Sequence, residues 1–75
     1  MTRYFFDVVR DGHDHVDWKG QQFLDLKAAK AHAAKIAREL AQDDRVYVGG
    51  SVCIADEHGK ELHRALIGVD VTIVD

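Results

Sequence analysis

The sequence is short of cysteine, serine and proline, and each shortage removes a class of site or structure. Cys53 is the only cysteine, Ser51 is the only serine, and the 75 residues include no proline. One cysteine forms no intramolecular disulfide and provides no paired spacing for zinc or redox chemistry. A lone thiol is typical of a reducing compartment, so we expect a cytoplasmic protein.

Long apolar runs and an excess of basic residues are also missing. The acidic Asp7 follows soon after the start, and no stretch has the length of a signal-peptide core or a membrane span. The formal net charge is −3. This balance disfavours general nucleic-acid binding, which depends on clustered Lys and Arg that neutralise phosphates. We therefore expect no membrane association and no general nucleic-acid partner.

The size of the chain favours a single domain that spans residues 1–75. Hydrophobic residues make up 47% of the sequence, but many are alanines, which bury little area, so the core is expected to be thin. A thin core without disulfides is commonly stabilised by association with a second copy. We expect a homodimer and no cofactor.

The first third of the chain predicts two strands. Tyr4, Phe6 and Val8 recur at period two, which indicates a strand that buries one face, and the strand runs into an Asp-Gly turn. Residues 13–16 are predicted to return antiparallel. Residues 17–20 then predict a second turn, and residues 21–24 a short extended link.

A helix is predicted to follow, with Asp25 as its N-cap and an end near Ala41 or Gln42. The apolar residues of this segment occupy one arc of a helical wheel about 100° wide, the width of a single buried face. These residues are Leu26, Ala29, Ala33, Ile36, Ala37 and Leu40.

The last part of the chain predicts more strands. Residues 46–48 and 51–55 are strand-like on either side of a glycine pair, and residues 61–67 are predicted to return through a hairpin with Leu62 and Leu66 inward. The alternating tail, residues 69–74, is expected to form a paired strand, either in its own sheet or with a second copy. The predicted fold class is α+β: a small antiparallel sheet on one helix, in the order β-β-α-β-β with this further strand.

The order of these segments resembles a family of short, uncharacterised bacterial proteins classed as a domain of unknown function. The resemblance runs from about residue 3 to residue 66. It is carried by Arg3-Tyr4-Phe5-Phe6, Arg10-Asp11-Gly12, the turn at residues 17–20, Asp25-Leu26, Ala37-Arg38-Glu39-Leu40 and Asp56-Glu57-His58-Gly59. It implies this fold and a bacterial origin, and it implies no activity and no site. Residues 13–15 and the tail fit the pattern less well.

One set of residues has the chemistry of a metal site. His13 and His15 lie two apart, so in a strand their imidazoles share a face, and Asp17 could add a carboxylate. The alternative is that all three are solvated side chains beside a turn. Cys53 could be a reactive thiol, but its apolar neighbours favour packing in a strand. The glycine pair before Ser51 lacks the lysine of a phosphate-binding loop.

Two surfaces are candidates for partner binding. The helix carries four bases, which could dock an acidic partner or a phosphate backbone or could simply keep the helix solvated. Several apolar residues have no obvious place in the core of one copy. The partner-binding candidates are Phe5, Trp18, Lys27, Lys30, Lys35, Arg38, Val69, Val71 and Ile73.

These patterns favour a small non-enzymatic module that acts by self-association or by binding another protein, with no catalytic residues. The first alternative is a metal- or small-ligand-binding protein that uses the His13, His15 and Asp17 set. The weaker alternative is nucleic-acid binding through the basic helix.

Overall fold

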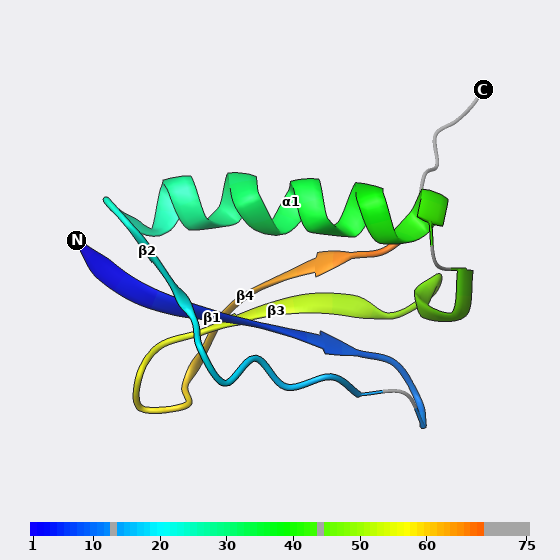
Figure 1. The fold of residues 1–75 in the computed structure, drawn as a ribbon, viewed down its shortest axis with the longest axis horizontal. Helices are drawn as coiled ribbons and strands as arrows, with labels where there is room; N and C mark the ends of the chain where they lie inside the picture. The colour runs from blue at the N-terminus through cyan, green and yellow to red at the C-terminus, as the bar shows by residue number, and fades with distance from the viewer. Residues whose placement is uncertain (13, 44, 69–75) are drawn as a thin grey trace.

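The computed structural model of the protein describes residues 1–12, 14–43 and 45–68. Their elements are β1 (Thr2–Val9), β2 (Gln21–Phe23), α1 (Leu26–Asp43), a short 3-10 helix η1 (Arg45–Tyr47), β3 (Ser51–Ala55) and β4 (Glu61–Leu66). The strands form one antiparallel sheet in the order β2-β1-β3-β4, and α1 lies across one face of it (Figure 1). The predicted α+β class is confirmed. The strand predicted over residues 69–74 lies outside the described residues.

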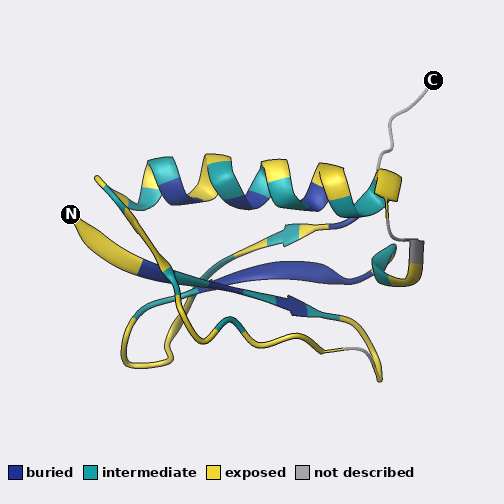
Figure 2. Ribbon diagram, in the orientation of Figure 1, coloured by how far each residue is buried: buried dark blue, intermediate teal, exposed yellow. Residues whose placement is uncertain are grey.

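β1 occupies the middle of the sheet because it pairs on both sides. Thr2–Tyr4 pairs with β2, and the stretch from Phe5 to Val9 pairs with β3. Tyr4, Phe6 and Val8 are buried on the side of α1, as their period-two spacing predicted. β3 is the most completely buried strand, with four of its five residues buried (Figure 2).

The second strand lies later in the chain than predicted. β2 falls in residues 21–23, the stretch that was expected to be only an extended link. Within the predicted return at residues 13–16, the described residues 14–16 contribute one bridge, in which Val8 and His15 exchange backbone hydrogen bonds of 2.9 and 2.7 Å. The cause is the turn at residues 17–20, which inserts extra chain and splits the edge of the sheet into two short pieces.

The helix matches its prediction closely. The Oδ1 of Asp25 accepts a hydrogen bond from the backbone N–H of Ala28 at 3.0 Å, which is the expected N-cap contact. Ala29, Ala33 and Ala37 are buried, and the small size of alanine lets α1 lie close to the sheet. The other members of the predicted arc, Leu26, Ile36 and Leu40, pack around this core. α1 ends at Asp43, slightly beyond the predicted end.

A half-buried histidine of α1 completes an aromatic cluster that the sequence analysis did not predict. The ring of His32 lies 5.0 Å from that of Phe6 and 5.1 Å from that of Phe23. Phe6 and Phe23 are themselves in contact, with their ring centroids 5.7 Å apart. The cluster therefore joins β1, β2 and α1, and it fixes the short strand β2 to the core.

The prediction of a strand at residues 46–48 is wrong, because this stretch belongs to η1 and the turn that follows it. Gly49 has a φ of +95°, a conformation that ends an extended run, and the backbone N–H of Gly50 donates to the carbonyl of Tyr47 at 2.9 Å. The two glycines also pair with Ile67 through hydrogen bonds of 2.9 and 3.0 Å. This pairing holds Ile67, the residue that follows β4, fully buried.

Leu62 and Leu66 of β4 were both predicted to point into the core, and this prediction is right for Leu62 and wrong for Leu66. Leu62 packs against the core, whereas Leu66 is 58% exposed. An irregularity in the β3–β4 pairing between Ile54 and Ala55 shifts the register, so the alternation of β4 changes along its length. Leu66 pairs with Ser51 and lies on the face of the sheet away from α1.

Candidate binding surface on the helix-free sheet face

The sheet face that α1 leaves uncovered is called the helix-free face. Its side chains form three rows across β1, β3 and β4, set by the strand registers. The rows are Phe5–Ala55–Glu61, Asp7–Cys53–Arg64 and Val9–Ser51–Leu66. The face therefore has apolar residues at both ends and opposite charges in its middle row.

Cys53 lies at the centre of this face and is only 5% exposed. Burial raises the pKa of its thiol above the ordinary value, and the nearby guanidinium of Arg64 offsets this only in part. Arg64 is itself held by Glu61 through hydrogen bonds of 3.2 and 2.9 Å. The thiol is therefore protonated and poorly nucleophilic at neutral pH, which is consistent with a packing role.

Asp17 organises the loop that rises beside β1. Its Oδ1 accepts hydrogen bonds from the backbone N–H groups of Lys19 at 3.1 Å and Gly20 at 3.0 Å, and its Oδ2 accepts one from Phe6 at 3.1 Å. The backbone N–H of Asp17 donates to the Oδ1 of Asp7 at 2.9 Å. Partial burial acts to raise the pKa of Asp17, but the three backbone hydrogen bonds and His15 outweigh it, so the pKa is lowered.

Gly20 lets this loop lie close to Phe5. Gly20 has a φ of +70°, and a Cβ at this position would lie 2.8 Å from the Cε2 of Phe5 and 2.9 Å from the Cγ of Arg3. The Phe5 ring therefore packs directly on glycine backbone and is half-buried. A hydrogen bond of 2.8 Å from the Nη1 of Arg3 to the carbonyl of Lys19 fastens the same loop to β1.

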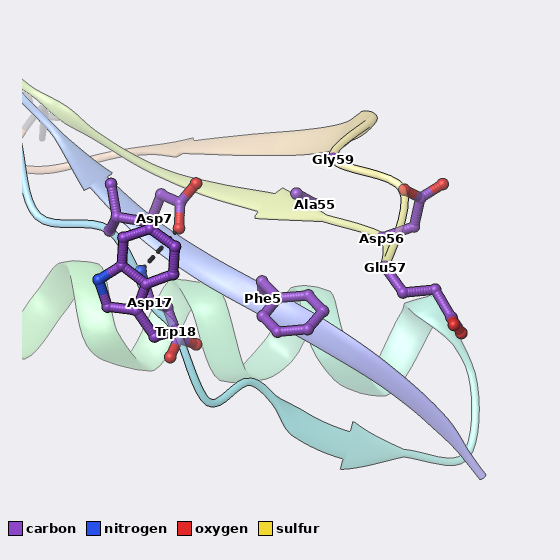
Figure 3. Close-up of a pocket in the computed structure, with 9 residues that line it drawn as sticks. Phe5, Asp7, Asp17, Trp18, Ala55, Asp56, Glu57 and Gly59 are labelled. Carbon is purple, nitrogen blue, oxygen red and sulfur yellow. Dashed lines mark hydrogen bonds between the residues drawn. The ribbon is translucent and has the colours of Figure 1, made fainter.

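A hollow of about 220 Å³ lies at the Phe5 end of the helix-free face. Figure 3 shows Phe5 between Trp18 on one side and the turn that connects β3 to β4 on the other, with α1 behind the sheet. Trp18 is 86% exposed. The hollow is lined by Phe5, Asp7, Val16, Asp17, Trp18, Ala55, Asp56, Glu57 and Gly59.

The charge around this hollow is negative. Asp7, Asp17, Asp56 and Glu57 line it, and none of the described residues that line it is basic. A hydrogen bond from the backbone N–H of Lys60 is the main cause of a lowered pKa at Asp56, helped by one from His58. Asp17 and Asp56 are therefore ionised at neutral pH. The side chain of Lys60 lies close enough to Asp56 to offset part of this charge.

The structure brings some of the predicted partner-binding residues together and separates others. Phe5 and Trp18 share the hollow. The helix bases Lys27, Lys30, Lys35 and Arg38 are all exposed on α1, on the other side of the sheet. Val69, Val71 and Ile73 lie outside the described residues. Sequence reasoning named Asp17 but missed Asp7, Asp56 and Glu57 as residues of the hollow, because no local pattern brings them together with Trp18.

The predicted metal set falls partly outside the described residues, since it includes His13. Of its other members, His15 is exposed and Asp17 uses both carboxylate oxygens to accept backbone hydrogen bonds. Within residues 1–12, 14–43 and 45–68, no group of three or more His, Cys, Asp or Glu side chains is arranged to hold a metal ion. The metal set stays a prediction.

Comparisons with known proteins identify a family but no function. The model of the family described as "Domain of unknown function (DUF6894)" matches residues 3–68. No curated protein and no solved structure matches the chain. In the described part of the chain, no helix has both the length and the apolar character that crossing a membrane requires.

Proposed function

The chain belongs to the DUF6894 family, whose function is unknown, and from this premise we propose that it is a small non-enzymatic module that binds protein through its helix-free face. The proposed partner is a second copy of the chain, with a homodimer as the smallest assembly.

The observation that carries this proposal is the exposure of Trp18. A tryptophan that is 86% exposed leaves a large apolar surface in water, and Val16, at 47% exposed, lies beside it in the same hollow. Leu66 extends the apolar surface at the far end of the face. Exposed aromatic side chains next to a hollow are typical anchors of protein interfaces.

A thin core supports self-association over binding to an unrelated protein. The largest fully buried side chains are Ile54, Ile67 and Val52, and the helix contributes only alanines to the fully buried set. A two-layer domain of this size gains stability when a second copy covers its open sheet face.

The non-enzymatic part of the proposal rests on how the reactive groups are used. The Cys53 thiol is buried with a raised pKa, and the Asp17 and Asp56 carboxylates have lowered pKa values because they hold backbone turns. A general acid would need the opposite shift. We also propose a bacterial cytoplasmic setting, which the free thiol and the earlier resemblance support.

The proposal is tested by sedimentation equilibrium across a wide range of protein concentration. We expect the wild-type chain to self-associate and Trp18→Ala to move the equilibrium to monomer. Leu24→Ala is the matched control, because Leu24 is 76% exposed but does not line the hollow. A wild-type chain that stays monomeric at millimolar concentration would overturn the proposal.

A further inference from the structure

We infer that self-association is head to tail, with the hollow of one copy holding a lysine or arginine side chain from α1 of the next copy. The inference rests on the proposed function and adds the residue that the partner contributes to the site.

The hollow has the chemistry of a site for one cationic side chain. Trp18 and Phe5 provide aromatic surface, and cations are attracted to the faces of such rings, tryptophan most strongly. Carboxylates surround this surface, with Asp17 and Asp56 held ionised. Among the described residues, Glu57 is exposed and makes no hydrogen bond or ion pair. An ammonium or guanidinium group would therefore find both aromatic and carboxylate partners there.

The chain itself carries the complementary group. α1 has four exposed bases against two exposed acids, Glu39 and Asp43. The bases form two pairs at a spacing of three residues, a spacing that places side chains on the same side of a helix. The pairs are Lys27 with Lys30 and Lys35 with Arg38. The helix is therefore a basic surface that lies on the side of the sheet opposite the acidic hollow.

The placement of these two surfaces determines the symmetry of the contact. Trp18 belongs to the helix-free side (Figure 3), whereas the helix bases are exposed on α1, which lies across the other face of the sheet (Figure 1). One copy therefore offers its hollow to the helix of the next, so a pair of copies keeps one free hollow and one free helix surface. Such a heterologous contact extends into a chain of copies, of which a dimer is the first step.

Mixing two complementary variants tests this arrangement. Trp18→Ala disables the hollow and leaves the helix intact, and we expect it to weaken self-association by about tenfold or more. Lys27→Gln/Lys30→Gln/Lys35→Gln/Arg38→Gln disables the helix surface and leaves the hollow intact. Glutamine has a helix propensity similar to that of lysine and arginine but carries no charge. Trp18 and the four helix bases are all exposed, so both variants should fold.

The expected result is that each variant alone is monomeric at a concentration where the wild-type chain associates, while their equimolar mixture forms a heterodimer that does not grow further. Association of the wild-type chain should weaken as sodium chloride is raised, because the contact pairs opposite charges. Sedimentation velocity gives the species, and circular dichroism melting confirms that each variant is folded. If the four-site variant is unfolded, Lys30→Gln and Arg38→Gln are tested singly.

The outcomes separate the inference from the proposed function. If the glutamine variant associates as the wild type does while Trp18→Ala does not, the helix-free face is the interface but the occupant is wrong, and the inference fails alone. If Trp18→Ala associates as the wild type does, the hollow is not the interface, and both the proposed function and the inference fail. If the wild-type chain is a monomer throughout, both fail.

Discussion

Asp17 provides Phe6 with the hydrogen-bond acceptor that a neighbouring strand would otherwise provide: the Oδ2 of Asp17 accepts a hydrogen bond of 3.1 Å from the backbone N–H of Phe6. This contact lies along β1 between the residues that pair with β2 and the Val8–His15 bridge. One carboxylate therefore satisfies a strand donor and, through its other oxygen, two donors of its own loop.

Replacement of Asp17 should destabilise the fold. Asp17→Ala removes the acceptor for the N–H groups of Phe6, Lys19 and Gly20, and the expected loss is about 1–3 kcal/mol in the free energy of unfolding, because water reaches part of this site. Chemical denaturation measures the loss. Glu39→Gln is the control, since Glu39 is exposed on α1, and it should change stability by less than about 0.5 kcal/mol. Equal effects of the two variants would contradict this role for Asp17.

The same carboxylate should make stability depend on pH in the acid range. The pKa of Asp17 is lowered in the folded chain, so its stabilising effect is complete above the unfolded-state pKa of about 4 and is lost as pH falls below it. Asp17→Asn has no such titration. The stability difference between wild type and Asp17→Asn should therefore shrink as pH is lowered from about 5 to 2. A difference that stays constant over this range would show that the charge does not matter.

Gly50 should tolerate no side chain. A Cβ there would meet the backbone oxygen of Val9 and lie 2.8 Å from the Cβ of Arg10, so β1 and the start of β3 would have to separate. Gly50→Ala should cost about 1–3 kcal/mol or more in thermal or urea unfolding. Gly59→Ala is the comparison, because Gly59 has a φ of +82° but no atom near the position of a Cβ. That variant should cost only about 1 kcal/mol of backbone strain.

His32 should contribute to stability through its ring contacts. His32→Ala removes the contacts of this ring with Phe6 and Phe23, and the expected loss is about 1–2 kcal/mol. His58→Ala, in the exposed turn after β3, should have little effect. Near-ultraviolet circular dichroism should also change for His32→Ala, because the aromatic rings lose their fixed packing. Identical melting curves for the two variants would rule out this contribution.

Cys53 should be protected from thiol reagents in the folded chain. Because burial raises the pKa of its thiol, the native chain should react with a disulfide reagent orders of magnitude more slowly than the chain in urea at pH 8. As pH rises, the reaction rate of the unfolded chain should level off first, near its thiol pKa of about 8.5, because its thiolate fraction saturates there. Equal rates in native buffer and urea would place the thiol on the surface.

The sequence predicted the elements whose signal lies within one segment of the chain. The spacing of Tyr4, Phe6 and Val8 correctly predicted the buried face of β1, and Asp25 correctly predicted the start of α1. Leu66 and residues 46–48 were predicted wrongly. The reasons are pairings between separate segments, which the pattern within one segment does not reveal: a register shift against β3 turns Leu66 outward, and the glycine pair bonds to Ile67.

The candidate site was predicted only in part for the same reason. Phe5 and Trp18 were proposed as partner-binding residues from their surplus apolar character, and the structure places both at the hollow. No pattern in the sequence predicts that the loop of Trp18 lies opposite Asp56 and Glu57. They meet because β1 and β3 are neighbours, with Phe5 opposite Ala55.

The pairing of β1 with β3 also has a consequence for how the chain folds. α1 and the β3–β4 hairpin join residues that are close in sequence, whereas the β1–β3 ladder joins Phe5 to Ala55 and Val9 to Ser51. The intervening chain, which includes β2 and α1, must close into a loop before this ladder gains any stability. Folding should therefore proceed at the slower rates of mixed α/β domains, although more residues lie in the helix than in any strand.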